Sequence, residues 1–300
     1  MHFIPFTTHL KKLPRGGSAA IGNFDGVHLG HQALLQQLQR LPGPRGVILF
    51  EPHPKERFAV EGQAPRRILM LADKLYFLRE QGLDYALVIH FNTQFSRWTP
   101  QQFIEVLLLK KLGLSTVVVG PDFRFGYQRQ GAIADLEAAG LKVQEVSWVQ
   151  SQGKKISSTL IRESLLAGEF QKVQSLLGHA YTVTGRVLQG AQKGRTLGFP
   201  TLNLALRPNM LLSGVYAVKI HGLADNALHG VANVGRRPSL NPLVHPLLEV
   251  HVFDFQKDVY GQRVRVEFVT KLREERRFPS LAELVAQISQ DVQNAKKELQ

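Results

Sequence analysis

The stretch 21–32, IGNFDGVHLGHQ, constrains the fold of this chain more than any other segment. It follows the small apolar run 18–21, which is typical of the end of a buried strand, and it precedes leucines at helical spacing. Its glycines permit a tight turn and let a ligand approach main-chain N–H groups. A helix that begins near 29–31 directs its free N–H groups and the positive end of its dipole into that turn. The stretch therefore predicts a strand, an anion-binding turn and a helix.

Two imidazoles in this turn, His28 and His31, lie three residues apart, where both could face one anion. Donors around a phosphate suit the stabilisation of a transition state in phosphoryl or nucleotidyl transfer, and neither side chain is an Asp, Ser or Cys nucleophile. The simpler alternative is a glycine turn with two surface histidines. In the nucleotide-binding interpretation both histidines are catalytic candidates. The phosphate-binding candidates of the turn are Gly22, Asn23, Phe24, Asp25, Gly26 and Gly30.

The length of the chain, 300 residues, is sufficient for two domains, each with its own core. The sequence contains no cysteine, which excludes disulfides, thiolate catalysis and cysteine-based zinc sites. No apolar run approaches the ~20 residues that a membrane span needs. The segment 1–17 lacks the apolar core and cleavage site of a signal peptide. We therefore expect a cytoplasmic enzyme with no membrane partner.

Positive charge is in excess, because Lys and Arg outnumber Asp and Glu by 37 to 24 and the formal net charge is +13. Such an excess attracts phosphates, nucleotides and nucleic acids alike. The cationic residues are scattered, and they form no stripe interleaved with aromatic residues, so a nucleic-acid-binding protein is the weaker alternative. We expect small-molecule substrates and no nucleic-acid partner. Self-association is possible, but the sequence carries no signal for it.

Strands and helices alternate in the first half of the chain. Helical patterns at 72–79 and after Thr99 separate apolar runs that are typical of buried strands. These runs lie at 46–50, 85–89, 115–119 and 142–146. The alternation predicts a Rossmann-like α/β domain, a parallel sheet with helices on both faces.

Polar loops follow two of these strands. The segment 51–54, EPHP, contains two prolines, which forbid a helix directly after the strand. The segment 120–126, GPDFRFG, gathers two aromatic residues, an arginine and a carboxylate. Open α/β sheets bind ligands at the carboxyl ends of their strands, so both loops are candidates for a ligand site. A plain connecting loop is the alternative for the first.

A second candidate phosphate site lies in 156–162, ISSTLIR. Its hydroxyls could act simply as a helix N-cap. Arg162 lies one turn inside the same predicted helix, so hydroxyls, free N–H groups and a guanidinium could converge on a phosphate. Two such motifs, each on its own strand-to-helix turn, are more specific than either alone. The candidates here are Ser157, Ser158, Thr159 and Arg162.

The pattern changes after a short predicted helix at 170–177. Short β-rich runs follow, separated by turns that carry Gly, Asn, Asp or Pro, and they predict an antiparallel β-barrel or sandwich. These runs lie at 181–188, 214–220, 228–233, 248–255 and 264–268. The apolar stripe of 280–288 predicts a closing amphipathic helix. We therefore expect two domains, 1–178 and 179–300.

The region 185–203 is the densest in glycine of this second half. It fails the pattern of a Walker loop, because its spacing is one residue short and an arginine replaces the lysine. A flexible hairpin flap is the alternative. Thr201 and Asn203 lie two residues apart, so on a strand their oxygen atoms face the same side. Mg²⁺ accepts such oxygens together with nucleotide phosphates.

These motifs resemble one known family, in the same order and along nearly the whole chain. GNFDGVHLGHQ and ISSTLIR are similar to the two phosphate motifs of the nucleotidyltransferase superfamily, which lie opposite one another there. Together with FEPHP and GPDFRFG they resemble the adenylyltransferase half of bacterial bifunctional riboflavin kinase/FMN adenylyltransferases. The resemblance implies a flavin site in this half. Its residues would be Phe50, Pro52, His53, Asp122, Phe123, Arg124 and Phe125.

In the second half, GRTLGFPTLN resembles the riboflavin kinase motif of the same family, with Leu202 where alanine is common. The resemblance implies that Thr201 and Asn203 hold Mg²⁺ and that Glu249, in LEVHVFD, is the general base. It also places Arg273 and Phe278 near the flavin. The phosphate-binding candidates that it implies are Gly185, Gly190, Gly194, Arg195, Gly198 and Pro200.

The activity that the resemblance implies is the ATP-dependent phosphorylation of riboflavin to FMN, followed by adenylylation of FMN to FAD with release of pyrophosphate. ATP would be the co-substrate of both steps and Mg²⁺ the metal. A nucleotidyltransferase that acts on another phosphate or carboxylate is the alternative. That alternative leaves Glu249 and the glycine-rich region unexplained.

Overall fold

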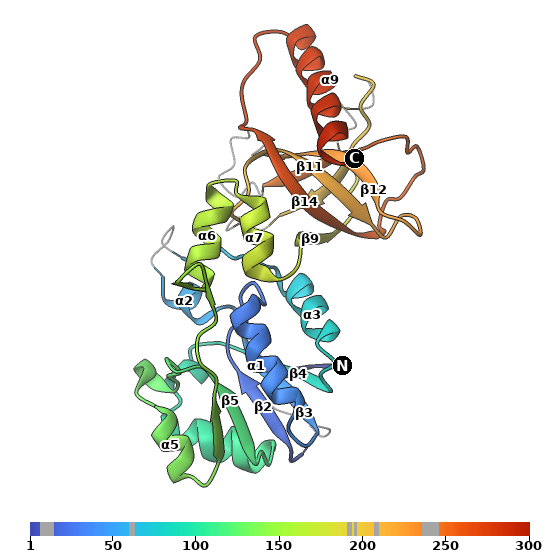
Figure 1. Cartoon of the computed structure of the whole chain (residues 1–300). Coiled ribbons are helices and arrows are strands. Elements are labelled where there is room, and N and C mark those ends of the chain that lie inside the picture. The colour runs from blue at the N-terminus through green and yellow to red at the C-terminus, as the bar shows by residue number, and fades with distance from the viewer. Residues whose placement is uncertain (7–14, 60–63, 191–193, 195–196, 207–209, 236–245) are drawn as a thin grey trace. The chain divides into compact units, whose positions relative to one another are not determined.

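The computed structural model of the chain describes residues 1–6, 15–59, 64–190, 194, 197–206, 210–235 and 246–300 (Figure 1). The chain forms two compact units. Unit 1 comprises Met1–Pro65 and Lys74–Ser157, and unit 2 comprises Arg66–Asp73 and Ser158–Gln300. Among the helices of the described residues, none is long and apolar enough to cross a membrane.

A sheet of six parallel strands forms the centre of unit 1, which confirms the predicted parallel sheet. The order across the sheet is β1 (His2–Phe6), β4 (Tyr85–His90), β3 (Arg45–Glu51), β2 (Ser18–Ile21), β5 (Thr116–Val119) and β6 (Lys142–Glu145). Strand β1 escaped the sequence analysis because its short run contains Pro5, which argues against a strand. Proline is tolerated here because β1 lies at the edge of the sheet.

Helices cover both faces of this sheet. Ile21 and Ile48 pack on one face with Phe103 and Leu107 of the helical segment after Thr99. On the other face, α1 lies over the near side of the sheet in Figure 1 and buries Leu35 and Leu38. The helices of this part of the chain are α1 (Leu29–Gln39), α2 (Pro54–Phe58), α3 (Leu71–Glu80), α4 (Pro100–Gln102) and α5 (Ile133–Ala138).

The helix predicted to begin at Thr99 is present, but its hydrogen bonding differs from that of an α-helix. Thr99 caps α4 through a capping box with Gln102. From Phe103 to Lys111 the chain then continues as a π-helix, and Leu112 N–H donates to the Leu107 carbonyl. Short 3₁₀ turns at Phe95–Arg97 and Tyr127–Arg129 and a two-residue hairpin, β7 (Gln150–Ser151) and β8 (Lys154–Lys155), complete unit 1.

Unit 2 contains a six-stranded antiparallel sheet that is nearly closed into a barrel, as predicted. Its order is β10 (Leu202–Ala205), β13 (Leu247–Val252), β12 (Leu228–Gly235), β11 (Gly214–His221), β14 (Arg263–Arg273) and β9 (Tyr181–Arg186). Leu188, just beyond β9, donates its N–H to the Asn203 carbonyl of β10 at 2.8 Å. This bridge brings the two edge strands together.

Helices α6 (Ser158–Leu166) and α7 (Phe170–Leu177) belong to unit 2. The ring of Phe170 packs against Phe268 and Tyr216 of the barrel, with centroids 6.2 and 5.5 Å away. The compact units thus divide at residue 157, with the segment Arg66–Asp73 joined to unit 2. Compactness does not show where each activity ends, so the functional domains 1–178 and 179–300 stay a prediction.

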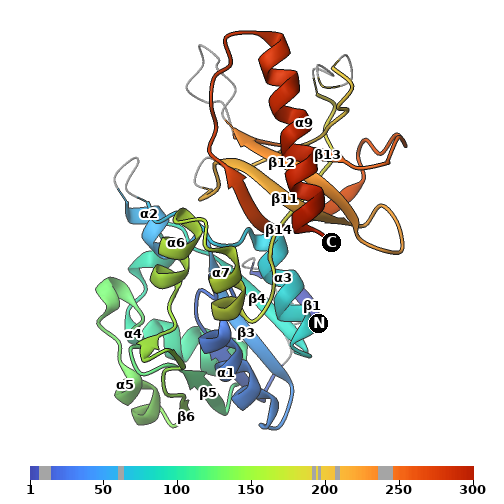
Figure 2. The same ribbon diagram turned by 45° about the horizontal axis from the view of Figure 1, so that its top comes forward.

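The last helix, α9 (Leu281–Glu298), begins where the apolar stripe predicted but extends ten residues beyond it. Its second half was not predicted because one of its buried positions is occupied by a carboxylate, Asp291. The helix packs on β11, β12 and β14, and Figure 2 shows it lying beside the barrel strands. Arg273 Nη2 and Nε donate to the Asp291 carboxylate at 2.7 to 3.1 Å. This ion pair fastens α9 to β14.

Replacement of Asp291 by alanine tests this attachment. The Asp291 side chain is 4% exposed and that of Arg273 is 21% exposed, so the variant leaves a largely buried guanidinium without its counter-charge. We expect a loss of about 3 kcal/mol in the free energy of unfolding of unit 2, the lower end for a broken buried pair. Denaturant unfolding measures it, with Asp225→Ala at an exposed site as control. Equal stability of the two variants would contradict the attachment.

Candidate functional site

The turn after β2 has the strand-to-helix form that the sequence predicted, but its strain lies at different residues. Of its three glycines only Gly26 has a positive φ, 92°, while Phe24 and Val27 also take positive φ, 49° and 42°. Both of these side chains are fully buried, and their burial holds this conformation. Gly30 serves a different purpose. A Cβ there would lie 3.1 Å from two atoms of the His28 ring.

His28 caps helix α1, and this fixes the direction of its ring. Its Nδ1 accepts the main-chain N–H of His31 at 3.3 Å, which satisfies one of the free donors of the first turn. In a neutral ring the proton therefore resides on Nε2. The rings of His28 and His31 are stacked, with centroids 3.7 Å apart. The two predicted catalytic histidines are thus brought together at the start of α1.

His31 lies between the rings of Phe24 and His28, and its Nδ1 is buried with no hydrogen-bond partner among the described residues. Burial lowers the pKa of His31 well below its ordinary value, and the charges of His28 and Lys74 lower it further. His31 is consequently neutral at physiological pH. It offers a neutral N–H donor rather than a full positive charge.

The second phosphate motif forms the start of α6, as predicted. Ser157 precedes the helix, Ser158 is its first residue and Thr159 is exposed. The Nε of Arg162, one turn later, donates to the main-chain carbonyl of Arg66 at 2.6 Å. Ser158 to Arg162 belong to unit 2, whereas the histidines belong to unit 1. Their convergence on one phosphate stays a prediction.

The flavin candidates of unit 1 lie in the loops after β3 and β5, as predicted. Phe50 contacts other aromatic rings, including Phe91 at 6.0 Å. His53 caps α2, because its Nδ1 accepts the N–H of Lys55 at 3.1 Å. Pro52, half-buried, directly precedes it.

The loop after β5 carries the other flavin candidates. The exposed Asp122 forms an ion pair of 2.6 Å with Lys155. Phe123 and Phe125 are stacked at 5.5 Å, and Arg124 between them is exposed. The ion pair and the stacked rings fix the shape of this loop. Its contact with flavin stays a prediction.

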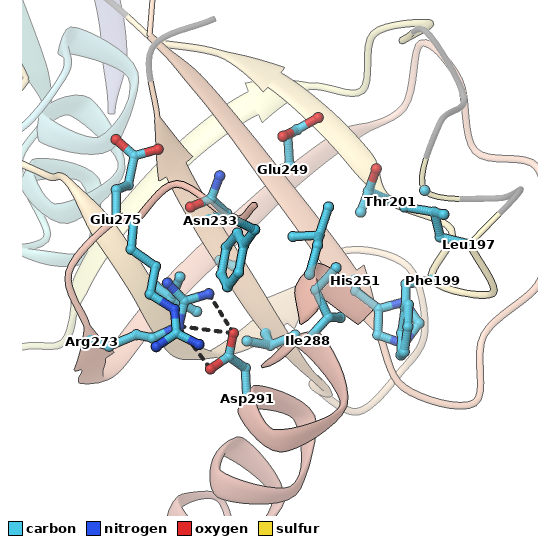
Figure 3. Close-up of a pocket in the computed structure, with 17 residues that line it drawn as sticks. Leu197, Phe199, Thr201, Asn233, Glu249, His251, Arg273, Glu275, Ile288 and Asp291 are labelled. Carbon is cyan, nitrogen blue, oxygen red and sulfur yellow. Dashed lines mark hydrogen bonds and ion pairs between the residues drawn. The ribbon is translucent and has the colours of Figure 1, made fainter. Parts of the chain in front are cut away.

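A pocket of about 360 Å³ lies in unit 2 (Figure 3). It is lined by polar and charged side chains from β12, β13, β14, α9 and the segments beside them, and by apolar groups that include residues of α9. The lining residues that the argument uses are Thr201, Asn233, Glu249, His251, Arg273, Glu275, Phe278 and Asp291. The pocket combines polar and charged groups with apolar ones, as sites for small molecules commonly do.

Strand register places the predicted base among amide side chains. Glu249 of β13 pairs with Asn203 of β10 on one side and with Asn233 of β12 on the other. Directly paired residues of adjacent strands project to the same face. The three side chains therefore form a row across the sheet, and Glu249 lines the pocket as predicted.

The residues predicted to hold Mg²⁺ fit such an ion. Asn203 is 6% exposed, and its side-chain Oδ1 has no hydrogen-bond partner among the described residues. A buried acceptor without a donor is costly unless a ligand satisfies it. Thr201, two residues earlier, lines the pocket. The described residues contain no group of three His, Asp or Glu that could hold a metal, so phosphate oxygens would supply the remaining ligands.

Glycines approach both of these oxygen-bearing residues. A Cβ at Gly190 would lie 2.3 Å from Asn203 Nδ2, and one at Gly194 would lie 3.4 Å from Thr201 Oγ1. Gly198 has a positive φ of 85°. Pro200 directly precedes Thr201. The phosphate-binding role of Gly190, Gly194, Gly198 and Pro200 stays a prediction.

Gly185 differs from the other glycines of this region. A Cβ there would lie 2.8 Å from Leu204, so this glycine serves packing. Arg195 lies outside the described residues.

Arg273 and Phe278 line the pocket, but most donors of Arg273 are engaged. Besides the pair with Asp291, its Nη1 donates to the Glu274 carbonyl at 2.9 Å. Phe278 lies beneath the guanidinium of Arg276, 4.7 Å from the ring centroid. The arrangement gives Arg273 a clear structural role, while its predicted contact with flavin is untested.

Several polar pocket residues were not predicted as site residues, among them Asn233 and His251. His251 lies two residues after Glu249 on the same face of β13, and its Nδ1 hydrogen-bonds the Pro200 carbonyl at 2.9 Å. Strand alternation could have identified it. Glu275 lies near the Glu249 charge. Burial raises the pKa of Glu275, the Glu249 charge raises it further, and Arg273 opposes the change.

Comparison with known proteins agrees with this division of sites. Residues 10–160 match the family model of FAD synthetase, and residues 177–299 match that of riboflavin kinase. The chain is 41% identical over 305 residues to the bifunctional riboflavin kinase/FMN adenylyltransferase of Haemophilus influenzae, covering 99% of this chain and 98% of that protein. It is 42% identical to the protein of the same description from Escherichia coli K12, covering 96% and 95%.

A crystal structure described as a macrolide-efflux protein from Streptococcus pneumoniae is 30% identical, with a TM-score of 0.79. The match covers 96% of this chain and 97% of that one. The description as a macrolide-efflux protein applies to that structure alone. With relatives more than 40% identical over nearly its whole length, this chain belongs to the family of bifunctional riboflavin kinase/FMN adenylyltransferases.

Proposed function

We propose that the pocket of unit 2 phosphorylates riboflavin and that the turn before α1 adenylylates the FMN so formed. The chain is a riboflavin kinase and FMN adenylyltransferase. What the proposal adds is the assignment of residues to each step. The observation that carries it is the row of Asn203, Glu249 and Asn233 across the sheet of unit 2, in which Glu249 and Asn233 line the pocket.

In the kinase step, the ribityl 5′-hydroxyl oxygen attacks the γ-phosphorus of ATP and ADP leaves. Glu249 takes the proton of this hydroxyl as the new P–O bond forms. Thr201 and Asn203 would hold Mg²⁺, which when bound neutralises charge on the phosphates. Gly190 and Gly194 pack closely against Asn203 and against Phe199 and Thr201, and the absence of their side chains leaves main-chain N–H groups open to the phosphates. The apolar wall with Phe278 receives the isoalloxazine ring.

In the adenylyltransferase step, a phosphate oxygen of FMN attacks the α-phosphorus of a second ATP. The bond to the β-phosphate breaks, and pyrophosphate leaves with the electron pair. His31 donates a hydrogen bond from its neutral ring to the charge that develops, and His28 supports the same region from the cap of α1. Arg162 and the hydroxyls of Ser158 and Thr159 hold the phosphates, with no covalent intermediate. A cytoplasmic location and the absence of a nucleic-acid partner stay predictions.

The replacement of Glu249 by glutamine separates the two activities. It preserves size and polarity but removes the base, so FMN formation should fall by about 10²–10⁴-fold. Adenylylation of supplied FMN should be unchanged, because that site lies elsewhere. Chromatographic separation of flavins measures both rates. Glu267→Gln, on strand β14 of the same sheet and paired with His221, is the matched control. A Glu249→Gln protein that loses both activities with an unchanged unfolding temperature would contradict the assignment.

The pH dependence of FAD formation tests the role of His31. Its pKa is lowered in the folded protein, so the ring is already neutral below the ordinary value of about 6.5. The rate should therefore not decline as the pH rises through this value. The acidic limb of the pH–rate profile, where the rate falls because His31 becomes protonated, should lie well below it. His31→Ala should lower FAD formation by about 10²–10³-fold and leave FMN formation intact. A rate that falls as His31 deprotonates near pH ~6.5 would instead indicate a required imidazolium.

A further inference from the structure

A buried lysine lies beside the histidine turn and has no part in the mechanism so far. Lys74, in the first turn of α3, is 3% exposed. Lysine is among the residues that are almost never fully buried, because desolvation of its ammonium is costly. Its Nζ donates to the main-chain carbonyl of Asn23 at 2.9 Å. Asn23 is the second residue of the turn, so this cation is attached to the turn itself.

The hydrogen bond fixes the orientation of one peptide of the turn. In a trans peptide the carbonyl and the following N–H point in opposite directions. With the Asn23 carbonyl held toward Lys74, the N–H of Phe24 points away from it. Phe24 has a positive φ of 49°, a conformation that needs support from its surroundings. Lys74 supplies part of that support from outside the turn.

The histidine turn also contains two buried polar groups without partners among the described residues. The side-chain Oδ1 of Asn23 and the Nδ1 of His31 are buried and have no hydrogen-bond partner among the described residues. The charge of Lys74 reaches His31, since it contributes to lowering the pKa of that ring. His28 is the other charged neighbour that acts on His31. A buried cation and two buried polar atoms thus lie in and beside the turn at which ATP is proposed to bind.

We propose that Lys74 is a positioning residue of the adenylyl-transfer site, which holds the Asn23 peptide in place and supplies a fixed positive charge beside His31. The inference rests on the proposed role of the histidine turn. A neutral His31 provides a donor but no net charge, whereas the departing pyrophosphate gains negative charge. A buried ammonium needs no reorganisation as that charge develops, and its effect is strong because the site is shielded from water.

Three substitutions separate charge from hydrogen bonding. Lys74→Arg retains both, Lys74→Gln retains a donor without charge, and Lys74→Met removes both. For the Gln and Met variants we expect a loss of about 10–100-fold in kcat/KM for ATP in FAD formation, the size typical of a supporting residue behind a direct contact. Arg should restore most of it. Arg79→Gln removes an exposed cation from the same helix and is the matched control.

The pH profile distinguishes this role from simple structural support. Removal of a positive charge raises the pKa of His31, so the acidic limb of FAD formation should move to higher pH in Lys74→Gln but not in Arg79→Gln. A purely structural lysine would lower thermal stability and kcat without moving that limb. FMN formation, measured in the same samples, should equal that of the parent in every variant.

The outcomes separate this inference from the proposed function. Parent-like FAD kinetics and pH profile in Lys74→Gln and Lys74→Met would overturn the role of Lys74, while His31→Ala in the same assay tests the turn independently. If His31→Ala makes FAD at the parent rate, the site assignment itself fails. If none of the three Lys74 variants yields a folded protein, the proposal is also overturned, because Lys74→Arg retains the charge that it assigns.

Discussion

Backbone hydrogen bonding between buried strands positions both sites of this enzyme. In unit 1, β2 pairs in parallel with β3 and β5 and ends at Ile21, so the histidine turn emerges at the carboxyl edge of the sheet. In unit 2, the antiparallel register of β10, β13 and β12 places Asn203, Glu249 and Asn233 side by side. A slip of one residue in either pairing would turn these side chains to the opposite face. Strand pairing therefore determines which groups meet at each site.

Both sites also contain polar groups that are buried without partners. Asn203 Oδ1 in the barrel and Asn23 Oδ1 and His31 Nδ1 in the turn are examples among the described residues. Each such group destabilises the fold by about 1–3 kcal/mol unless a ligand satisfies it. The surrounding structure holds them in place: the buried Phe24 and Val27 hold the turn, and the Arg273–Asp291 pair secures α9 beside the pocket. Under the proposed function, bound substrate and metal would supply partners for groups that folding leaves without one.

The sequence predicted most of the strands and the change of architecture, because these follow from periodicity and local turn chemistry. Glu249 and the flavin candidates came from the family resemblance instead. It did not reveal β1, since Pro5 argues against a strand unless its edge position is known. It underestimated α9, because Asp291 is buried only through its pairing with Arg273, a residue of another element. Asn233 joins Glu249 in the pocket through the register of β12 and β13, a tertiary pairing of the same kind. Local patterns do not record such long-range pairings.

The central claim is that one chain holds two separate sites, which share FMN as product and substrate. Complementation between two single-site variants tests it most directly. Glu249→Gln and His31→Ala proteins are mixed with riboflavin, ATP and Mg²⁺, and FAD is measured over time. The account predicts FAD from the mixture, because one protein makes FMN and the other adenylylates it, and little from either protein alone. No FAD from the mixture, while each variant keeps its remaining activity, would contradict two separable sites that exchange FMN through solution.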